Sequence, residues 1–574
     1  MVTIAESLVT ALADLGVSTV WGVVGDALNP ITDAIRREKR LEWIGVRHEE
    51  VAAFAAGAQS QLSGTIGVCM GTVGPGSVHL LNGLYDAKKS HAPVLAICGQ
   101  VPTSEIGSNF FQEVDNDLLF RDVAVYTSTV TSPNQMPYAL EHAVNTALSR
   151  SGVAVLTIPG DIGAAELPSG SPSPRFVRTD AITVPGEENI RAAAEMLNEA
   201  KNVTLLVGAG ARSARDEVMD VASTLQAPMV LTLKAKETLE YENPYAVGQT
   251  GLIGNPAAYA ALEACDVLMM IGTDFPYRQW YPQGKKVIQL ESRPEHIGRR
   301  TPVDISLVGQ CRPALRALLP ALTPRSDDKH LATARKDYQS WCAAQSRLAD
   351  PDHDHTLLGR LRRHADNPEA RIRPEALAAA LDRHAAADAI FTSDTGMSTV
   401  WLSRFVTMSG RRQLLGSYNL GSMANALPQA LGAQALDRDR HVIALSGDGG
   451  LMMLLGDLRT AVSYNLPITI VVFDNGRLGM VKLEQEEGGL PEFGTVLDNP
   501  NLAAVAEAMG FTARRVTDPN DLDAALHEAL AERSPTLLDV LTNPNEISVP
   551  PKPSVDQAWG FAIAKVKESL DSRH

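Results

Sequence analysis

The sequence predicts an α/β protein with several parallel-sheet domains. Short apolar runs, bounded by Gly, Asp or Pro, alternate with helical patterns along almost the whole chain; clear examples are residues 17–25, 93–99, 203–210, 441–447 and 467–474. Continuous apolar runs are typical of strands buried on both faces, as in parallel sheets that helices cover. At 574 residues, the chain is long enough for about three or four such domains.

A repeated pattern indicates that two of these domains are related. The blocks 74–97 and 447–470 both read as strand, Gly-rich turn, helix, Pro and strand. At offsets 0, 8, 11 and 17 they share Gly76, Leu84, Ala87 and Pro93 in the first block with Gly450, Leu458, Ala461 and Pro467 in the second. Every βαβ unit needs a glycine turn and a helix-ending signal, so a chance match is the alternative. Two related domains, one near each terminus, are the simpler explanation.

Two polar stretches divide the chain. A Pro- and Ser-rich segment covers residues 166–176, and a charged, polar segment covers residues 323–337; both are typical of linkers. We therefore predict an N-terminal domain at 1–180, a middle domain at 181–335, a linker at 336–370, a C-terminal domain at 371–548 and a tail at 549–574.

Composition excludes several classes of function. The net charge of −16 argues against nucleic acid as a partner, because phosphate binding needs a basic surface. Five widely spaced cysteines lack the spacing of metal ligands, which favours a reducing cytosol. The N-terminus is typical of a helix and not of a signal peptide. No apolar run approaches the roughly 18 residues that a membrane span needs.

An acid and an amide follow two neighbouring predicted strands. In LSGDGGLMML, Asp448 lies among glycines directly after an apolar run, and Asp474 and Asn475 follow the next apolar run. Ligands of parallel sheets bind beyond the carboxyl ends of strands, where glycine turns let phosphates approach helix N-termini. Magnesium prefers carboxylate, amide and phosphate oxygens. A lone GDG is commonly just a turn, but the two motifs together predict a magnesium diphosphate site.

The spacing of these motifs resembles the signature of the thiamine-diphosphate enzymes, GDG followed some 25 residues later by NN. This chain departs from it at Asp474, which stands where the family has the first Asn. The resemblance implies thiamine diphosphate and Mg²⁺ as cofactors. Asp448 and Asn475 would be side-chain ligands of the metal, and the carbonyl of Arg477 would be the third protein ligand.

The family also uses a glutamate from its other type of α/β domain. In VRHEEVAAFAAGA the resemblance selects Glu49, at a predicted strand-to-helix junction, as the acid that hydrogen-bonds to the aminopyrimidine ring. That contact favours the imino tautomer, which can deprotonate the thiazolium carbon. Taken without the resemblance, Glu49 reads as an acid that interacts with a helix dipole.

Further segments match the surroundings of the cofactor in this family. In GSMANALP, Met423 would be the apolar wedge under the bent cofactor, and the carbonyl of Gly421 would accept from the pyrimidine amine; a methionine there could also be ordinary core. DTGMST, residues 394–399, would lie over the diphosphate. The implied cofactor contacts are Glu49, Gly396, Met397, Ser398, Gly421, Met423, Asp448, Gly449, Gly450, Asn475, Leu478, Gly479 and Met480.

Within the family, the chain is most similar to the bacterial pyruvate oxidases, and among them to the quinone-linked enzymes. The resemblance implies three doubly wound parallel-sheet domains: pyrimidine-binding, FAD-binding and diphosphate-binding. TGLI and TDFPY match segments that contact FAD, and Glu291 stands where the branch has an acid for the adenine ribose. GAGAR, 208–212, lacks a third glycine and is no independent sign of a dinucleotide. The implied FAD contacts are Thr250, Gly251, Leu252, Ile253, Thr273, Asp274, Phe275, Pro276, Tyr277 and Glu291.

The implied reaction is the oxidative decarboxylation of pyruvate to acetate and CO₂. Hydroxyethyl-thiamine diphosphate would pass two electrons to FAD, which would reduce a membrane quinone. Phe111 and Gln112 would border the substrate. Met480, also an implied catalytic residue, would lie on the thiamine side, where quinone-linked relatives tend to carry an aromatic residue. An acetolactate-synthase-like carboligase and an oxygen- and phosphate-dependent oxidase are the alternatives.

The resemblance also implies an assembly of several copies. The glutamate and the metal site lie on different domains, and the family places the cofactor between subunits, so we expect a dimer at least and a homotetramer by analogy. Residues Trp559, Ile563, Val566 and Leu570 would share one face of a helix in the tail. Such a helix could dock on the inner face of the cell membrane, or it could pack against the protein itself.

Overall fold

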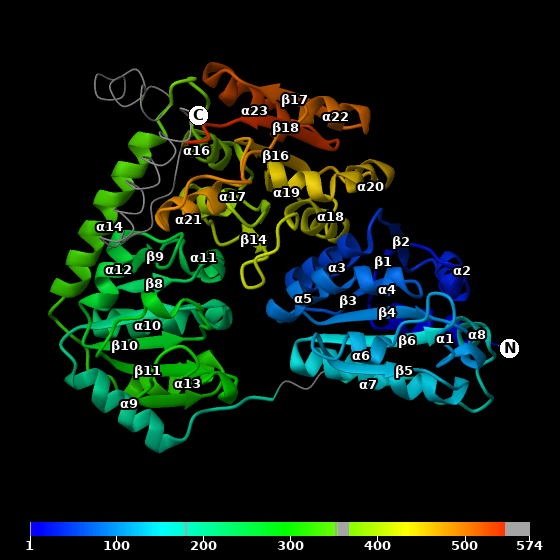
Figure 1. The fold of residues 1–574 in the computed structure, drawn as a ribbon. Coiled ribbons are helices and arrows are strands. Elements are labelled where there is room, and N and C mark those ends of the chain that lie inside the picture. Colours follow the sequence, from blue (N-terminus) through cyan, green and yellow to red (C-terminus); the bar gives the residue numbers. More distant parts are fainter. Residues whose placement is uncertain (1, 178–180, 351–352, 354–366, 546–574) are drawn as a thin grey trace.

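The computed structural model describes residues 2–177, 181–350, 353 and 367–545, and these form three six-stranded parallel sheets (Figure 1). The predicted fold class, an α/β protein with three doubly wound parallel sheets, is confirmed. The predicted tail helix at 549–574 lies outside the described residues. Within the described ranges, no helix is both long and apolar enough to cross a bilayer.

The N-terminal sheet has the strand order β2-β1-β3-β4-β6-β5. Its strands are β1 (Thr19–Gly22), β2 (Glu42–Gly45), β3 (Gly67–Gly71), β4 (Val94–Gln100), β5 (Ala124–Thr129) and β6 (Val153–Pro159). Its helices are α1 (Ile4–Asp14), α2 (Asn29–Arg37), α3 (Glu49–Ser63), α4 (Pro75–His79), α5 (Leu81–Lys89), α6 (Asn116–Leu119), α7 (Met136–Arg150) and α8 (Gly160–Ala164).

The C-terminal sheet repeats this topology, with the order β14-β13-β15-β16-β18-β17. Its strands are β13 (Ile390–Ser393), β14 (Gln413–Gly416), β15 (Val442–Gly447), β16 (Thr469–Asp474), β17 (Thr512–Val516) and β18 (Thr536–Leu541). Its helices are α16 (Pro374–His384), α17 (Met397–Phe405), α18 (Ala426–Leu436), α19 (Asp448–Met453), α20 (Leu458–Ser463), α21 (Gly479–Glu487), α22 (Leu502–Ala508) and α23 (Leu522–Ala531).

The middle sheet has a different order, β12-β11-β10-β7-β8-β9, which is that of dinucleotide-binding doubly wound folds. Its strands are β7 (Val203–Val207), β8 (Met229–Leu231), β9 (Ala246–Gln249), β10 (Val267–Ile271), β11 (Lys286–Glu291) and β12 (Ile305–Val308). Its helices are α9 (Glu187–Glu199), α10 (Arg215–Leu225), α11 (Leu233–Leu239), α12 (Pro256–Glu263) and α13 (Cys311–Leu318). Helix α14 (Lys329–Leu348) packs on α12 and continues into the predicted linker.

Each sheet is covered on both faces. Successive residues of β4 belong to different cores: Ala96 packs into one cluster and Ile97 into another. The same alternation occurs at Ala444 and Leu445 of β15. Continuous apolar runs therefore form these strands, because neither face meets water.

The N-terminal and C-terminal domains share one of these cores. Helix α3 packs against α18, and the same hydrophobic cluster includes residues of both helices and both sheets. Figure 1 shows the two helices side by side where the two domains meet. The carboxyl ends of the two sheets are thereby held in a fixed relation within the chain.

Candidate active site

A cavity of about 250 Å³ lies at the carboxyl ends of β13, β15 and β16. This is the point at which the strand order of the sheet reverses, since β13 and β15 are neighbours and their connections leave in opposite directions. The structure gathers here the predicted cofactor residues of the C-terminal domain. They are Gly396, Met397, Ser398, Gly421, Met423, Asp448, Gly449, Gly450, Asn475, Arg477, Leu478, Gly479 and Met480.

Two buried carboxylates share the same hydrogen-bond donors beside this cavity. The Asp448 Oδ2 atom accepts from the Gly476 amide at 2.9 Å and from the Asn499 side-chain amide at 2.6 Å. Asp474 Oδ1 accepts from the same two groups, at 3.3 and 3.0 Å. Burial, and next the negative charge of Asp474, raise the pKa of Asp448 to about 7. Such a pair of acids fits a divalent cation, which would offset the repulsion between them.

Asp394, which the sequence analysis did not single out as a site residue, builds the floor of this cavity. Its buried carboxylate accepts from the Ala426 amide at 2.9 Å and from the Ser446 hydroxyl at 2.6 Å. A Cβ atom at Gly450 would lie 2.4 Å from Asp394 Oδ2, so only glycine fits there. Burial raises the pKa of Asp394 to about 6. The carboxylate thus ties the ends of β13 and β15 together under the GDG turn.

We expect Mg²⁺ to stabilise the protein more at pH 8 than at pH 5. The pKa of Asp448 rises from its ordinary value of 3.8 to about 7 on folding, so the folded protein holds this proton more tightly than the unfolded chain. Without metal, the stability that depends on this group falls as the pH rises from about 4 to about 7. Mg²⁺ should reverse that loss and raise the melting temperature by a few degrees at pH 8.

Thermal melts at constant ionic strength, with and without Mg²⁺, check this expectation. Asp448→Asn removes the titrating group, so the pH-dependent part of the Mg²⁺ effect should vanish in that variant. An equal Mg²⁺ effect at both pH values in the unmodified protein would contradict the expectation.

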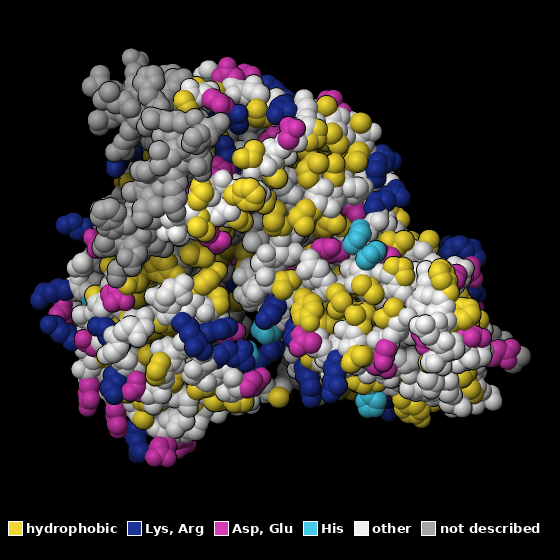
Figure 2. Space-filling view, in the orientation of Figure 1, with side chains coloured by type: hydrophobic (Ala, Val, Ile, Leu, Met, Phe, Trp, Pro, Cys, Tyr) yellow, Lys and Arg dark blue, Asp and Glu magenta, His cyan; other side chains and the backbone are white. Residues whose placement is uncertain are grey.

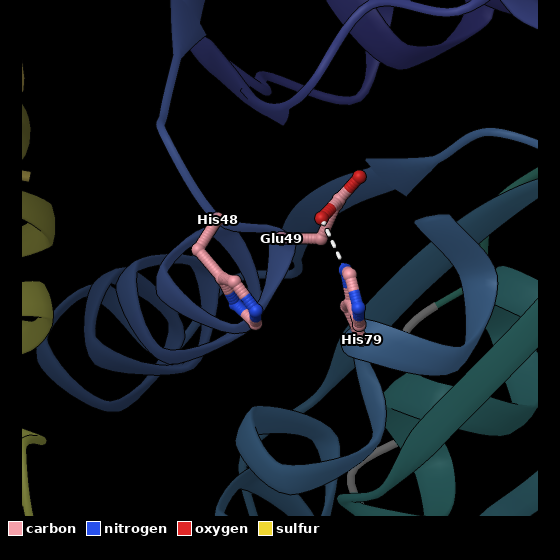
Figure 3. Close-up of side chains that lie close together, drawn as sticks. All are labelled: His48, Glu49 and His79. Carbon is pink, nitrogen blue, oxygen red and sulfur yellow. Dashed lines mark hydrogen bonds and ion pairs between the residues drawn. The ribbon is translucent and has the colours of Figure 1, made fainter. Parts of the chain in front are cut away.

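Glu49 lies on the N-terminal domain and not in the cavity beside Asp448 (Figure 3). It begins helix α3 after the N-cap residue His48, is only 8% exposed, and its Oε2 lies 2.9 Å from Nδ1 of His79. Sequence reasoning missed His79, which is the last residue of α4 and has no motif that marks it. Glu49 does not line the cavity that holds Asp448, and no described residue of the N-terminal domain does.

His48, Glu49 and His79 place their possible ligand atoms within 4.8 Å of one another. Their orientation does not suit one metal ion. The two imidazole rings stack with centroids 4.5 Å apart and planes inclined by 24°. The lone pairs of an imidazole lie in its ring plane, so nearly parallel rings direct them side by side and not toward a shared ion about 2 Å away. The cluster is better described as the Glu49 carboxylate in a hydrogen bond with the His79 ring.

The predicted substrate residues Phe111 and Gln112 lie on the same side of the molecule as Glu49. Gln112 has a left-handed backbone with φ of 67° and packs on the turn at Gly74. Two residues further along this turn, Gly76 lies against the Glu49 carboxylate. The Phe111 side chain is 78% exposed. The predicted catalytic residues therefore form two separate groups within one chain, with Met480 in the other group.

A second cavity, of about 670 Å³, lies where the three domains meet. It is lined by nine of the ten predicted FAD residues: Thr250, Leu252, Ile253, Thr273, Asp274, Phe275, Pro276, Tyr277 and Glu291. Gly251 is not part of the lining and instead packs against the Phe275 ring. The Thr250 hydroxyl is buried without a hydrogen-bond partner among the described residues. An unmatched polar atom of this kind fits a wall that faces a polar ligand.

Besides the acids Asp274 and Glu291, this cavity has basic side chains that suit an anionic group of a ligand. Arg212, Lys234 and Arg293 line it, and Figure 2 shows basic and histidine side chains gathered in the hollow between the middle and N-terminal domains. Burial lowers the pKa of Lys234 to about 8. Sequence reasoning did not single out these three residues, although Arg212 ends the GAGAR segment, because each comes from a different element. Gly208 lines the cavity between the ends of the neighbouring strands β7 and β10, where the strand order reverses. A Cβ atom at this position would lie 2.3 Å from the Gly272 carbonyl oxygen, so a larger residue would not fit.

The two cavities have a wall in common. Thr395, Gly396, Gly421 and Met480 line both of them. A ligand in the large cavity and a ligand beside Asp448 would therefore be separated by only a few side chains.

Comparison with protein families gives a match for each of the three domains. The N-terminal TPP binding domain of thiamine pyrophosphate enzymes matches residues 2–119, the central domain of these enzymes matches residues 190–318, and their C-terminal TPP binding domain matches residues 394–540.

Several curated proteins are similar over nearly their whole length. A putative thiamine pyrophosphate-containing protein, YdaP, of Bacillus subtilis is 38% identical, with 100% of this chain and 97% of the relative covered. Acetolactate synthase isozyme 2 large subunit of Escherichia coli is 32% identical, with 93% and 95% covered. Pyruvate oxidase of Lactiplantibacillus plantarum is 29% identical, with 93% and 88% covered.

Proposed function

The chain belongs to the thiamine pyrophosphate enzymes, and on that premise we propose that it is a pyruvate oxidase. Pyruvate would be decarboxylated and oxidised to acetate and CO₂, and the electrons would pass to FAD and then to a quinone. The observation that carries the proposal is the wall shared by the two cavities, since an oxidase has to bring its two cofactors close together. The similarity to a pyruvate oxidase supports the same reaction.

The residues beside the smaller cavity would hold thiamine diphosphate through its metal. Asp448, Asn475 and the carbonyl of Arg477 would bind Mg²⁺, and the bare backbone at Gly449 and Gly450 would let the diphosphate approach. Met423 would support the bent cofactor. When bound, thiamine diphosphate would supply a nucleophilic ring carbon for the keto carbon and a positively charged ring as the sink for the electron pair left by CO₂. The protein contributes orientation and the exclusion of water.

Glu49 would act as the acid that holds a proton at the aminopyrimidine ring, and His79 would orient its carboxylate from 2.9 Å. Because Glu49 and Asp448 do not share a cavity within one chain, we propose that Glu49 of one subunit completes the site of another. Phe111 and Gln112 would reach the substrate from the same side as Glu49. The protein would then be active only as a dimer or a larger assembly, and a homotetramer is our expectation.

The larger cavity would hold FAD across the switch point of the middle sheet. Glu291 lies at the end of β11, is 8% exposed and accepts from the Arg293 amide at 3.1 Å. Its other oxygen would accept from the adenine ribose hydroxyls, as acids at the ends of other strands do in dinucleotide-binding sheets. The three basic residues of the lining would offset the charge of the FAD diphosphate.

Glu291→Gln is expected to weaken FAD binding about 10-fold to 100-fold, since a hydrogen bond to a charged group contributes about 1.5–3 kcal/mol. Fluorescence titration of the apoprotein with FAD gives the dissociation constant. Glu295→Gln is the matched control, because Glu295 lies in the short 3-10 helix that follows β11 and is exposed. If both variants bind FAD as tightly as the unmodified protein, Glu291 does not contact the ribose.

Anaerobic mixing of the holoenzyme with pyruvate tests the reaction. An oxidase should bleach the flavin rapidly and yield one acetate for each FAD reduced, and a quinone should restore the flavin colour. Formation of acetolactate while the flavin stays oxidised would overturn the proposal in favour of a carboligase, which the similarity to acetolactate synthases also allows. Acetyl phosphate and peroxide formed only with phosphate and oxygen would identify the third kind of enzyme.

A further inference from the structure

We infer that Asn499 is a positioning residue of the metal site, which holds the Asp448 carboxylate and the turn at residues 476–478 in the arrangement that Mg²⁺ requires. This inference rests on the proposed function, because it assumes that thiamine diphosphate and Mg²⁺ bind beside Asp448. Asn499 lies outside every motif that identifies the family in this chain.

The side-chain amide of Asn499 bridges the two carboxylates. Its Nδ2 atom donates to Asp448 Oδ2 at 2.6 Å and to Asp474 Oδ1 at 3.0 Å. Asn499 is not among the described residues that line the cofactor cavity. Asn499 therefore contacts Asp448 from outside the cavity, and its hydrogen bond uses Oδ2 and leaves Oδ1 of Asp448 for the metal. Groups that hydrogen-bond to a ligating carboxylate fix its orientation and tune the metal.

The segment that carries Asn499 is fastened to the turn that would carry the third ligand. We call residues 492–499 the strap. The Leu497 amide donates to the Gly476 carbonyl at 2.8 Å, and the Leu478 amide donates to the Thr495 carbonyl at 2.8 Å. Arg477 pairs with the Glu492 carboxylate, which also accepts from the Thr495 hydroxyl at 2.6 Å. A shift of the strap would thus move the Asp448 partner and the Arg477 carbonyl together.

This chain has Asp474 where the family signature has an asparagine, so the group that bridges Asp448 and Asp474 should be uncharged. The family has an amide at that position, whereas here a second carboxylate faces Asp448. The Arg515 guanidinium lies 3.6 Å from the Asp474 carboxylate and 3.5 Å from the Asp539 carboxylate, so it pairs with both acids. Arg515 is not among the described residues that line the cavity. A lysine in place of Asn499 would put a competing cation next to Mg²⁺. An amide donates to both carboxylates without adding charge.

Asn499→Ala tests the inference through metal binding and not through activity. With thiamine diphosphate saturating, the dissociation constant of Mg²⁺ should rise about 10-fold to 100-fold, as is typical when a partner of a metal ligand is removed. Ca²⁺ tolerates irregular coordination, whereas Mg²⁺ demands near-octahedral geometry. The affinity for Ca²⁺ should therefore fall less than that for Mg²⁺. Calorimetric titration of the full chain with each ion gives both constants.

Asn501→Ala is the matched control. Asn501 lies two residues further on and caps helix α22, where its side chain accepts from the Ala504 amide at 3.1 Å. Its loss should lower the melting temperature and leave the ratio of Mg²⁺ to Ca²⁺ affinity unchanged. Asn499→Gln keeps the amide but displaces it by one methylene, so it should lower the same ratio if the alanine variant does not fold.

The outcomes separate the inference from the proposed function. If the unmodified chain binds neither Mg²⁺ nor thiamine diphosphate, the proposed function fails. If it binds both, and the Asn499 variants bind Mg²⁺ as tightly and with the same preference over Ca²⁺, only the inference about Asn499 is overturned. An equal loss in Asn501→Ala would also overturn it, because the effect would then come from general loosening of the loop.

Discussion

Asp448→Asn is expected to abolish the Mg²⁺-dependent binding of thiamine diphosphate, with a loss of affinity of at least about 100-fold. Removing a partner of a metal ligand already costs about 10-fold to 100-fold, and Asp448 would be the ligand itself. Its carboxylate also lines the cavity together with Asn475 and Gly449. Calorimetry with thiamine diphosphate, at fixed Mg²⁺, measures the loss.

The stability of the same variant distinguishes a lost ligand from a damaged fold. Without metal, the ionised Asp448 is repelled by Asp474, which helps to raise the pKa of Asp448. Asparagine removes that repulsion, so the metal-free variant should melt at the same temperature as the unmodified protein or slightly higher. Asp457→Asn removes another buried acid of this domain, one that accepts from the Arg47 amide at 2.9 Å. That control should lose stability and keep its affinity for the cofactor. Unchanged cofactor binding in Asp448→Asn would remove Asp448 from the metal site.

The fold could be predicted where the chain is buried on both sides. The apolar runs at 203–207 and 442–447 became β7 and β15, which are inner strands of their sheets. Edge strands give a weaker signal, because one side of each meets solvent or a loop. Strand β17, at one edge, carries two arginines and alternates between exposed and half-buried residues before it ends at the buried Val516. The apolar pattern of the sequence therefore predicts the inner strands of a parallel sheet better than its edge strands.

The site could be predicted where ligands lie at the ends of neighbouring strands. Asp448 and Asn475 follow β15 and β16, which pair in parallel, so their meeting is a consequence of the fold. Asn499, His79 and Lys234 could not be found in this way. Each reaches its partner across the tertiary structure from a position whose local sequence is ordinary. The resemblance, and not the local sequence, led us to expect the cofactor between subunits, and within one chain Glu49 does not line the cavity beside Asp448.

Glu49→Gln is expected to lower kcat about 10²-fold to 10⁴-fold, which is the usual contribution of a positioned acid or base. Glutamine keeps the size of the side chain but cannot carry the proton. Binding of Mg²⁺ and thiamine diphosphate should change little, since Glu49 lies away from the metal residues. Glu50→Gln is the matched control, because the Glu50 carboxylate accepts from Asn82 at 2.7 Å and is not in contact with His79 in the structure. A Glu49 variant with nearly full activity would exclude this residue from the chemistry.

Combining the two inactive variants shows whether Glu49 and Asp448 of one active site come from the same chain or from two chains. Coexpression of Glu49→Gln and Asp448→Asn chains with different tags allows the mixed dimer to be purified. If Glu49 of one chain completes the Asp448 site of the other, one site of each mixed dimer has both residues intact, and the other site lacks both. The mixed dimer should then have about half of the unmodified activity, as follows from a two-fold symmetric interface. If each chain supplied both residues of its own site, every site would carry one substitution and the mixture would stay inactive. That result would require the N-terminal and C-terminal domains to move against the shared core of α3 and α18, which the buried contact between these helices opposes.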